Sequence, residues 1–301
     1  MRAENKISNP LSDRIFYTVN YTLLSIFLLL VLYPFIYVIS CSFSSGDALM
    51  RGAVWLLPVK PSLDGYKAVF SYTPIWSGYL NSLVYMAAGT LLNVVMTIMA
   101  AYPLSRKDLM GRKGFMFYFM FTMLFNGGLI PNFLLISRLG LMNTRLAIIL
   151  PAAMSAFNVI VTRTFFSQTI PQDLLESAKI DGCSDVRFLV RIVVPLSGPI
   201  IAVIALWVAV AFWNSYFSAL IYLNDDKLYP LQIVLRNILI VTTQIDFSKT
   251  SVDPKLLQQS QYMAQVLKYG TIIVGSVPLM ILYPFVQKYF VKGVMIGSLK
   301  G

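Results

Sequence analysis

Few side chains in this 301-residue chain could carry out chemistry, and most classes of reaction lack a group that they require. There is no histidine, and the two cysteines, Cys41 and Cys183, lie far apart in the sequence. A transition-metal site needs several histidine or cysteine ligands, so none is expected. No G-x-x-x-x-G-K-[ST] run is present to hold ATP phosphates. We therefore expect a chain that catalyses no bond chemistry and holds no cofactor.

Charge is concentrated between two apolar runs, where residues 173–195 read DLLESAKIDGCSDVRFLVRIVVP. All acidic residues of the chain lie outside its long apolar runs. Proton-coupled carriers relay protons through buried carboxylates or histidines, and this chain has none to use. A loop that only joined two membrane spans could be much shorter than this segment. We therefore predict that the segment binds a partner in the cytosol.

The first half of the segment has the signals of a short surface helix. Pro171 suits a first helical turn, because it lacks an N–H group that would be unpaired there. Asp173 and Glu176 lie toward the positive end of the helix dipole. Two leucines and Ala178 recur at helical spacing and form a small apolar face. Gly182 follows as the expected C′ residue, where a positive φ is tolerated.

A second short helix is predicted directly after the turn. Ser184 can cap its N-terminus, with Asp185 in its first turn. Arg187 and Arg191 share a face because they are four residues apart. Pro195 is expected to end this helix before the next apolar run. From these residues alone, an amphipathic surface hairpin without a partner stays open as an alternative.

The elements that must position this hairpin are membrane spans. The chain is 57% hydrophobic and 12% charged, with a mean hydropathy of +0.70, whereas soluble domains average about 25% charged residues. Apolar runs of about 20 residues can cross the hydrocarbon core as helices. We predict an all-α integral membrane protein whose residues 1–301 form one transmembrane domain. Six spans are expected at 15–40, 79–102, 115–137, 145–167, 197–221 and 266–287, with the hairpin at 171–195.

The net charge of +11 is assigned to membrane orientation rather than to nucleic-acid binding. The basic residues are spread over short loops, and no basic stripe runs along the chain. The dense cluster at 106–113 places that loop in the cytosol by the positive-inside rule. Both termini, including a tail at 288–301, are then cytosolic, and the loops 41–78 and 222–265 lie outside.

The spacing in the hairpin resembles a motif of the inner-membrane permease subunits of ABC importers, E-A-A, then G, then I-x-L-P. Here residues 176–178 read E-S-A, residue 182 is Gly, and residues 192–195 read I-V-V-P, with Ser177 and Val194 as conservative departures. In that family the segment is a coupling helix that docks on an ATPase subunit, which binds ATP and Mg²⁺. The resemblance implies an ATPase-docking site made of Glu176, Ser177, Ala178, Asp181, Gly182, Arg187, Ile192 and Pro195.

Other stretches resemble the maltose-type, carbohydrate-uptake branch of that family. They are Tyr33-Pro34-Phe35, Trp213-Asn214 and the Gly-rich ending YFVKGVMIGSLKG. The runs NGGLIP at 126–131 and LGLMNT at 139–144 look like permeases for oligosaccharides released from polysaccharides. Many such substrates contain uronic acids.

The resemblance also implies a set of partners and a location. It implies the bacterial cytoplasmic membrane, a second homologous permease, two ATPase subunits, an extracytoplasmic binding protein and an oligosaccharide substrate. In that family the C-terminal tail reaches between the two ATPases. Gly293, Gly297 and Gly301 would permit such an extended path.

Sugars are held by aromatic stacking and by hydrogen bonds to their hydroxyl groups. Trp213 and Tyr216 are three residues apart and would share a helix face. The alternative for each buried asparagine is a hydrogen bond between helices, which satisfies the amide in lipid. The substrate pathway is predicted to include Trp213, Asn214, Tyr216, Asn81 and Asn158, with Asn93 and Trp207 as further candidates.

Two other classes of function stay open. An ATP-independent secondary carrier or channel for small solutes would transport in liposomes without an ATPase. A structural or assembly subunit would have no pathway, so removing the Trp213 and Tyr216 side chains would leave uptake unchanged. With no energy source inside the chain, the importer permease is favoured.

Overall fold

Helices make up the regular structure of this protein throughout the part of the chain that the computed structural model describes, residues 11–243 and 254–298. The longer helices are α1 (Leu11–Ser42), α4 (Thr73–Ser105), α5 (Arg112–Leu124), α8 (Ala156–Thr169), α12 (Gly198–Trp213), α14 (Leu231–Thr243) and α15 (Pro254–Ser298). The shorter ones are α2 (Gly46–Met50), α3 (Asp64–Ser71), α6 (Leu129–Arg138), α7 (Leu146–Ile149), α9 (Gln172–Ile180), α10 (Asp185–Phe188), α11 (Val194–Leu196) and α13 (Phe217–Tyr222). Single turns of tighter or wider helix join them at η1 (Leu150–Ala152), η2 (Leu189–Val193) and η3 (Asp226–Leu228). The predicted all-α membrane fold is confirmed.

The chain forms two compact units. One consists of the chain up to Ser71 together with Ile238–Val274, and the other of Tyr72–Asn237 together with the chain from Gly275 onward. Both the docking candidates and the pathway candidates lie in the second unit. The first unit therefore needs only a short description.

In the first unit, α1 buries only its end, at Ser40, Cys41 and Ser42. None of its apolar window is buried inside the chain, so lipid or another subunit must cover it. The chain then folds into a cap in which α3 packs on the first part of α15. A Cβ atom on Gly65 would lie 2.9 Å from the Val266 carbonyl oxygen, so this crossing requires a glycine.

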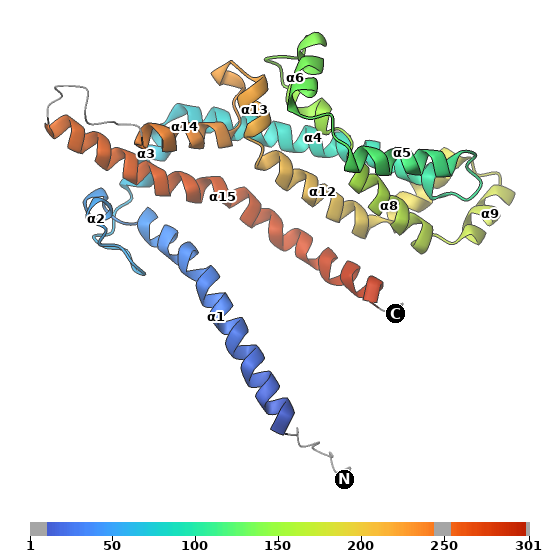
Figure 1. Ribbon diagram of the computed structural model, residues 1–301, viewed down its shortest axis with the longest axis horizontal. Coiled ribbons are helices and arrows are strands. Elements are labelled where there is room, and N and C mark those ends of the chain that lie inside the picture. Colours follow the sequence, from blue (N-terminus) through green and yellow to red (C-terminus); the bar gives the residue numbers. More distant parts are fainter. Residues whose placement is uncertain (1–10, 244–253, 299–301) are drawn as a thin grey trace. The chain divides into compact units, whose positions relative to one another are not determined.

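The second unit is built around α4, which packs along α12 and α8, while α5 packs on α8 (Figure 1). The α4–α12 crossing is close, because a Cβ on Gly89 would come within 2.2 Å of the Phe212 ring. The buried core here includes Tyr85, Val159 and Ile204. This packing places the C-terminal end of α4 against the segment that follows α8.

Several predicted spans are broken helices, which differs from the continuous segments expected. Across 115–137, α5 and α6 meet at 109°, because residues 126–128 read N-G-G and Gly128 adopts φ +87. Across 145–167, the helical stretch 146–152 meets α8 at 45°. Across 197–221, α12 ends at Trp213 and a new helix starts at Phe217. Within the described residues, three helices are long enough to span, or up to six if each bent pair is one span.

The C-terminal segment is helical further than expected. α15 continues to Ser298 and contains the positions of Gly293 and Gly297. An extended path through those two glycines is therefore not what this structure has, since the helix runs on from the sixth apolar run. Residues 299–301, with Gly301, lie outside the described residues.

Candidate functional site

The hairpin, residues 171–195, has the local geometry that its sequence predicts. α9 ends at Ile180, and Gly182 adopts φ +73, the left-handed conformation that favours glycine. The Gly182 N–H donates to the Lys179 carbonyl at 3.0 Å, and the Cys183 N–H donates to the Ala178 carbonyl at 2.9 Å. The Ser184 hydroxyl caps α10 by accepting from the Arg187 N–H. These bonds set the turn between the two short helices.

The predicted docking residues divide between the two sides of the hairpin. Those on the exposed side are Glu176, Ser177, Asp181, Gly182, Arg187 and Pro195. Ala178 is 9% exposed and packs into the core with Phe188, while Ile192 is half-buried against the same core. Ala178 and Ile192 therefore hold the hairpin on the protein and do not face a partner.

Two apolar side chains on the outer surface were missed by the sequence analysis. Ile180 is 87% exposed and Val186 is 73% exposed. The signal was present, because Ile180 lies two residues beyond Ala178 and so about 200° around the helix from the buried face. With Glu176, Asp181 and Gly182 they form the outer face of the hairpin.

The end of the hairpin corrects the role given to Pro195. This proline does not end the second helix, because α10, η2 and α11 run continuously to Leu196. The turn η2 is a π-helix, which widens the backbone just before the proline. The chain then bends by 81° between 185–196 and 198–213. The bend, and not the proline alone, separates the hairpin from α12.

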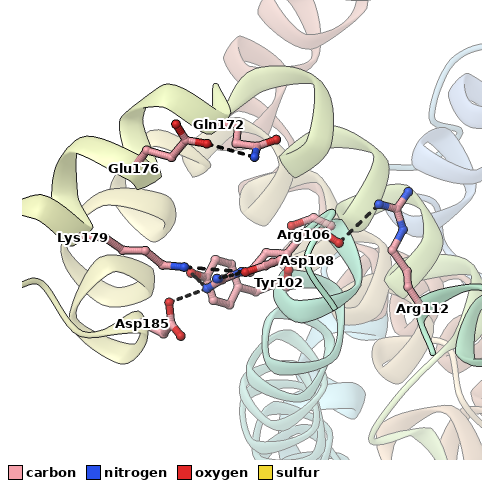
Figure 2. Close-up of polar contacts among 9 residues, drawn as sticks. Tyr102, Arg106, Asp108, Arg112, Gln172, Glu176, Lys179 and Asp185 are labelled. Atoms are coloured by element: carbon pink, nitrogen blue, oxygen red, sulfur yellow. Dashed lines mark hydrogen bonds and ion pairs between the residues drawn. The ribbon is translucent and has the colours of Figure 1, made fainter. Parts of the chain in front are cut away.

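An ion cluster ties the hairpin to the C-terminal end of α4 (Figure 2). Arg106, one residue beyond α4, donates to both carboxylate oxygens of Asp108, at 2.9 Å from Nε and 2.5 Å from Nη2. The same guanidinium donates to Asp185 and, at 3.3 Å, to the Tyr102 hydroxyl. Lys179 Nζ lies 3.6 Å from Asp108 Oδ2. Tyr102, Arg106, Asp108, Lys179 and Asp185 are the Arg106 cluster hereafter.

Within the Arg106 cluster, the guanidinium of Arg106 keeps the Asp108 carboxylate ionised at neutral pH. The guanidinium lowers the pKa of Asp108 from the ordinary 3.8 to about 2. Because the folded pKa lies below the unfolded one, the stabilisation from this pair is present above the unfolded pKa and is lost as the pH falls toward about 2. The Arg106 side chain is only 13% exposed. Dissolved salt therefore screens its charge less than it screens the charge of a fully exposed side chain. No sequence pattern linked residues 106 and 185.

Asn81 is held by hydrogen bonds to other parts of the protein. Its Nδ2 group donates to the carbonyls of Lys227 and Tyr229, at 2.7 and 3.1 Å. Its Oδ1 atom accepts from Arg145 at 3.0 Å. Both polar atoms of the Asn81 amide therefore have hydrogen-bond partners within the protein, as expected if this asparagine joins helices to one another.

The expected pairing of Trp213 and Tyr216 on one helix face is wrong. Trp213 is the last residue of α12, fully buried, and its indole donates to the Gly275 carbonyl at 3.0 Å. Tyr216 follows the break and is 46% exposed. Asn214 donates back to the Val210 carbonyl of its own helix. Because the helix ends at Trp213, the spacing of three residues does not place Tyr216 on the same helix face.

Trp213 is therefore expected to matter for stability. Replacing it by alanine should lower the free energy of unfolding by about 3–5 kcal/mol, as for other buried aromatic side chains. Trp213→Phe should cost less, about 1–2 kcal/mol, since it removes the hydrogen bond and part of the ring. Thermal unfolding of the detergent-solubilised protein measures both. Tyr216→Ala is the control, and its free energy of unfolding should stay within about 0.5 kcal/mol of the unmodified protein. If Trp213→Phe lost uptake at unchanged stability, that result would instead favour a role of Trp213 in the substrate pathway.

Asn158 is the pathway candidate that does line a cavity. The cavity has a volume of about 620 Å³ and is bordered by α4, α8 and α12. Asn93 and Trp207, the two further candidates, also line it. The amide of Asn158 donates to Asn93 Oδ1 at 3.3 Å. The structure thus brings together one of the five predicted residues, Asn158, and both further candidates.

These features define an all-helical membrane protein with a hairpin tied to one span, and comparison with known proteins shows its class. Residues 3–296 match the family described as binding-protein-dependent transport system inner membrane component. The chain belongs to this family, and is a transport permease rather than an enzyme.

Its similarity to individual members extends over nearly the whole chain. It is 41% identical over 291 residues to the polygalacturonan/rhamnogalacturonan transport system permease protein YtcP of Bacillus subtilis (strain 168), covering 97% of this chain and all of that one. It is 39% identical to Protein LplC of the same organism, covering 97% of each. A chain in the crystal structure of a bacterial ABC transporter involved in the import of the acidic polysaccharide alginate is 36% identical. That match covers 94% of this chain and 99% of the other, with a TM-score of 0.84.

Proposed function

We propose that this chain is the permease subunit of an ATP-driven importer for oligosaccharides, including uronate-containing ones, in the bacterial cytoplasmic membrane. Two relatives support the substrate class, since one is named for polygalacturonan and rhamnogalacturonan and another serves alginate import. Both termini are cytosolic in this proposal, as the basic cluster at 106–113 favours. The chain works with a second permease, two ATPase subunits that hold ATP and Mg²⁺, and an extracytoplasmic binding protein.

The outer face of the hairpin is the proposed ATPase-docking surface. The observation that carries the proposal is that this face is exposed while the opposite face is anchored in the core, at Ala178 and Phe188. Exposed Ile180 and Val186 supply apolar contact area, and Glu176, Asp181 and Arg187 surround them with charge. An apolar centre with a polar rim is the usual anatomy of a protein interface.

Force reaches the spans through two attachments of the hairpin. The Arg106 cluster joins it to α4, and the continuous helix from Asp185 to Leu196 leads into α12. Because α4 and α12 pack closely on each other at Gly89 and Phe212, a movement of the hairpin would be felt by both. Closure of the ATPases would in this way switch the spans between inward-open and outward-open forms.

Reconstitution tests the proposal directly. The complex of this chain, its partner permease and the two ATPases is placed in liposomes and supplied with the binding protein loaded with oligogalacturonate. Uptake should require ATP and the binding protein, and the ATPases should co-purify through a tag on this chain. Transport by this chain in liposomes that hold no ATPase would overturn the proposal in favour of a secondary carrier or channel.

A further inference from the structure

The cavity between α4, α8 and α12 has the size of a small-ligand site. Its volume of about 620 Å³ lies within the roughly 300–1,000 Å³ of typical ligand pockets. Asn93 from α4, Asn158 from α8 and Trp207 from α12 line it, together with Phe157 and Ser215. Polar and aromatic groups from three helices thus meet around one space.

One polar atom of a residue that lines this cavity accepts no hydrogen bond within the described part of the chain. Asn93 and Asn158 are 3% and 6% exposed. Asn93 Nδ2 donates to the Ala152 carbonyl at 2.8 Å, and Asn93 Oδ1 accepts from Asn158 at 3.3 Å. The remaining oxygen, Asn158 Oδ1, accepts no hydrogen bond from the part of the chain that the structure describes. This oxygen is therefore available to accept a hydrogen bond from a ligand hydroxyl.

An aromatic wall faces the same space. Trp207 is 39% exposed, and its ring centroid lies 5.6 Å from that of Phe157, with the two rings inclined at 35°. Both residues line the cavity. Aromatic faces of this kind carry the apolar face of a sugar ring, while neighbouring amides and hydroxyls bind its edge.

The cavity lining carries no charged residue. It also differs from a lipid groove. A second hollow of about 370 Å³, against Met86, Leu91 and Leu282, has Thr90 as the single polar residue among those that line it. That hollow suits an acyl chain, whereas the first has two amides and three serines. An uncharged polar lining suits hydroxyl groups and offers nothing to neutralise a carboxylate.

We propose that this cavity is a saccharide subsite within the chain, in which Trp207 stacks on one sugar ring and Asn158 Oδ1 accepts from a ring hydroxyl. The subsite binds the ring through its uncharged groups and does not recognise its carboxylate. This rests on the proposed function, because it assigns the oligosaccharide a place in the permease.

Binding to the assembled, nucleotide-free complex tests the subsite without the binding protein. The probes are oligogalacturonate and its methyl ester, which is the same sugar without charge, and binding is followed by ligand-observed NMR. The unmodified complex should bind both probes with similar affinity. Trp207→Ala should weaken both by about tenfold, whereas Trp207→Phe should restore most of the loss.

A charge placed in the cavity gives the sharper result. Asn158→Asp, at mildly alkaline pH, should weaken the acidic probe at least about tenfold more than the ester, because like charges repel strongly in a low-dielectric site. Asn81→Asp is the matched control, since Asn81 is equally buried but bonded to Arg145 outside the cavity. Phe217→Ala, an exposed aromatic side chain outside the cavity, is the control for Trp207.

The outcomes distinguish a failure of the proposed subsite from a failure of the proposed importer function. If the complex binds neither probe, or the Trp207 and Asn158 variants match their controls, the subsite is disproved even where ATP-driven uptake is normal. If binding follows the expected pattern but uptake never requires ATP, the subsite stands and the importer function fails.

Discussion

Gly182→Asp is expected to abolish uptake while the protein remains folded in the membrane. A Cβ atom at this position meets nothing within 4 Å, so a new side chain would project from the outer face without a steric clash. Aspartate also tolerates the left-handed conformation better than most residues. At a docked interface its unpaired charge would cost about 3–5 kcal/mol, which corresponds to more than a hundredfold weaker association. Co-purification of the ATPase measures this loss.

Two further substitutions at Gly182 distinguish the effect of the charge from the effects of side-chain size and backbone strain. Gly182→Asn has the same size and the same backbone tolerance but no charge, so it should retain far more ATPase than the aspartate variant. Gly182→Val strains the backbone, because β-branched residues rarely adopt a φ of +73. A Gly182→Asp complex that co-purifies and transports normally would show that this face does not contact the ATPase.

Breaking the Arg106 cluster is expected to uncouple ATP hydrolysis from uptake. Arg106→Ala removes the guanidinium that joins the α4 end to Asp185 of the hairpin. The ATPases should still bind, because Arg106 is not on the outer face, but sugar imported per ATP should fall about tenfold, the effect of about 1.4 kcal/mol of lost coupling. The ratio of uptake to hydrolysis in proteoliposomes is the measurement.

A double-mutant cycle shows whether the pair acts as a unit. Asp185→Ala alone should reproduce part of the defect, and the double variant should be no worse than Arg106→Ala. Lys107→Ala is the matched control, as a neighbouring exposed cation outside the cluster. Strictly additive effects, or an unchanged ratio in Arg106→Ala, would show that the hairpin drives the spans through α12 alone.

Much of the fold and of the hairpin could be predicted because the signals are local. Apolar length marks the membrane segments, and Ser184, Gly182 and Asp173 mark helix ends through capping, backbone conformation and the helix dipole. Each of these acts within one turn of helix. A single sequence contains that information directly.

The parts that could not be predicted depend on contacts between distant residues. Asp185 meets Arg106 across 79 positions, and Trp213 meets Gly275 across 62. The breaks at Asn126–Gly128 and at Asn214 were missed because hydropathy continues through them. Since the helix stops at Trp213, residues chosen by helical spacing for the pathway were on the wrong faces. Asn93, Asn158 and Trp207 were named as candidates from their residue types, but no spacing rule indicated that these three line one cavity.

The bend between η1 and α8 leaves a carbonyl that an unbroken helix would have satisfied. In a continuous helix the Ala152 oxygen would accept from the N–H four residues on, and here it accepts from the Asn93 side chain of α4 at 2.8 Å. An unpaired carbonyl in hydrocarbon costs several kcal/mol. One amide on a neighbouring helix therefore satisfies the carbonyl that the bend leaves without a partner in its own helix. The same asparagine lines the cavity, so one side chain joins the bent backbone of the fourth span to the cavity wall.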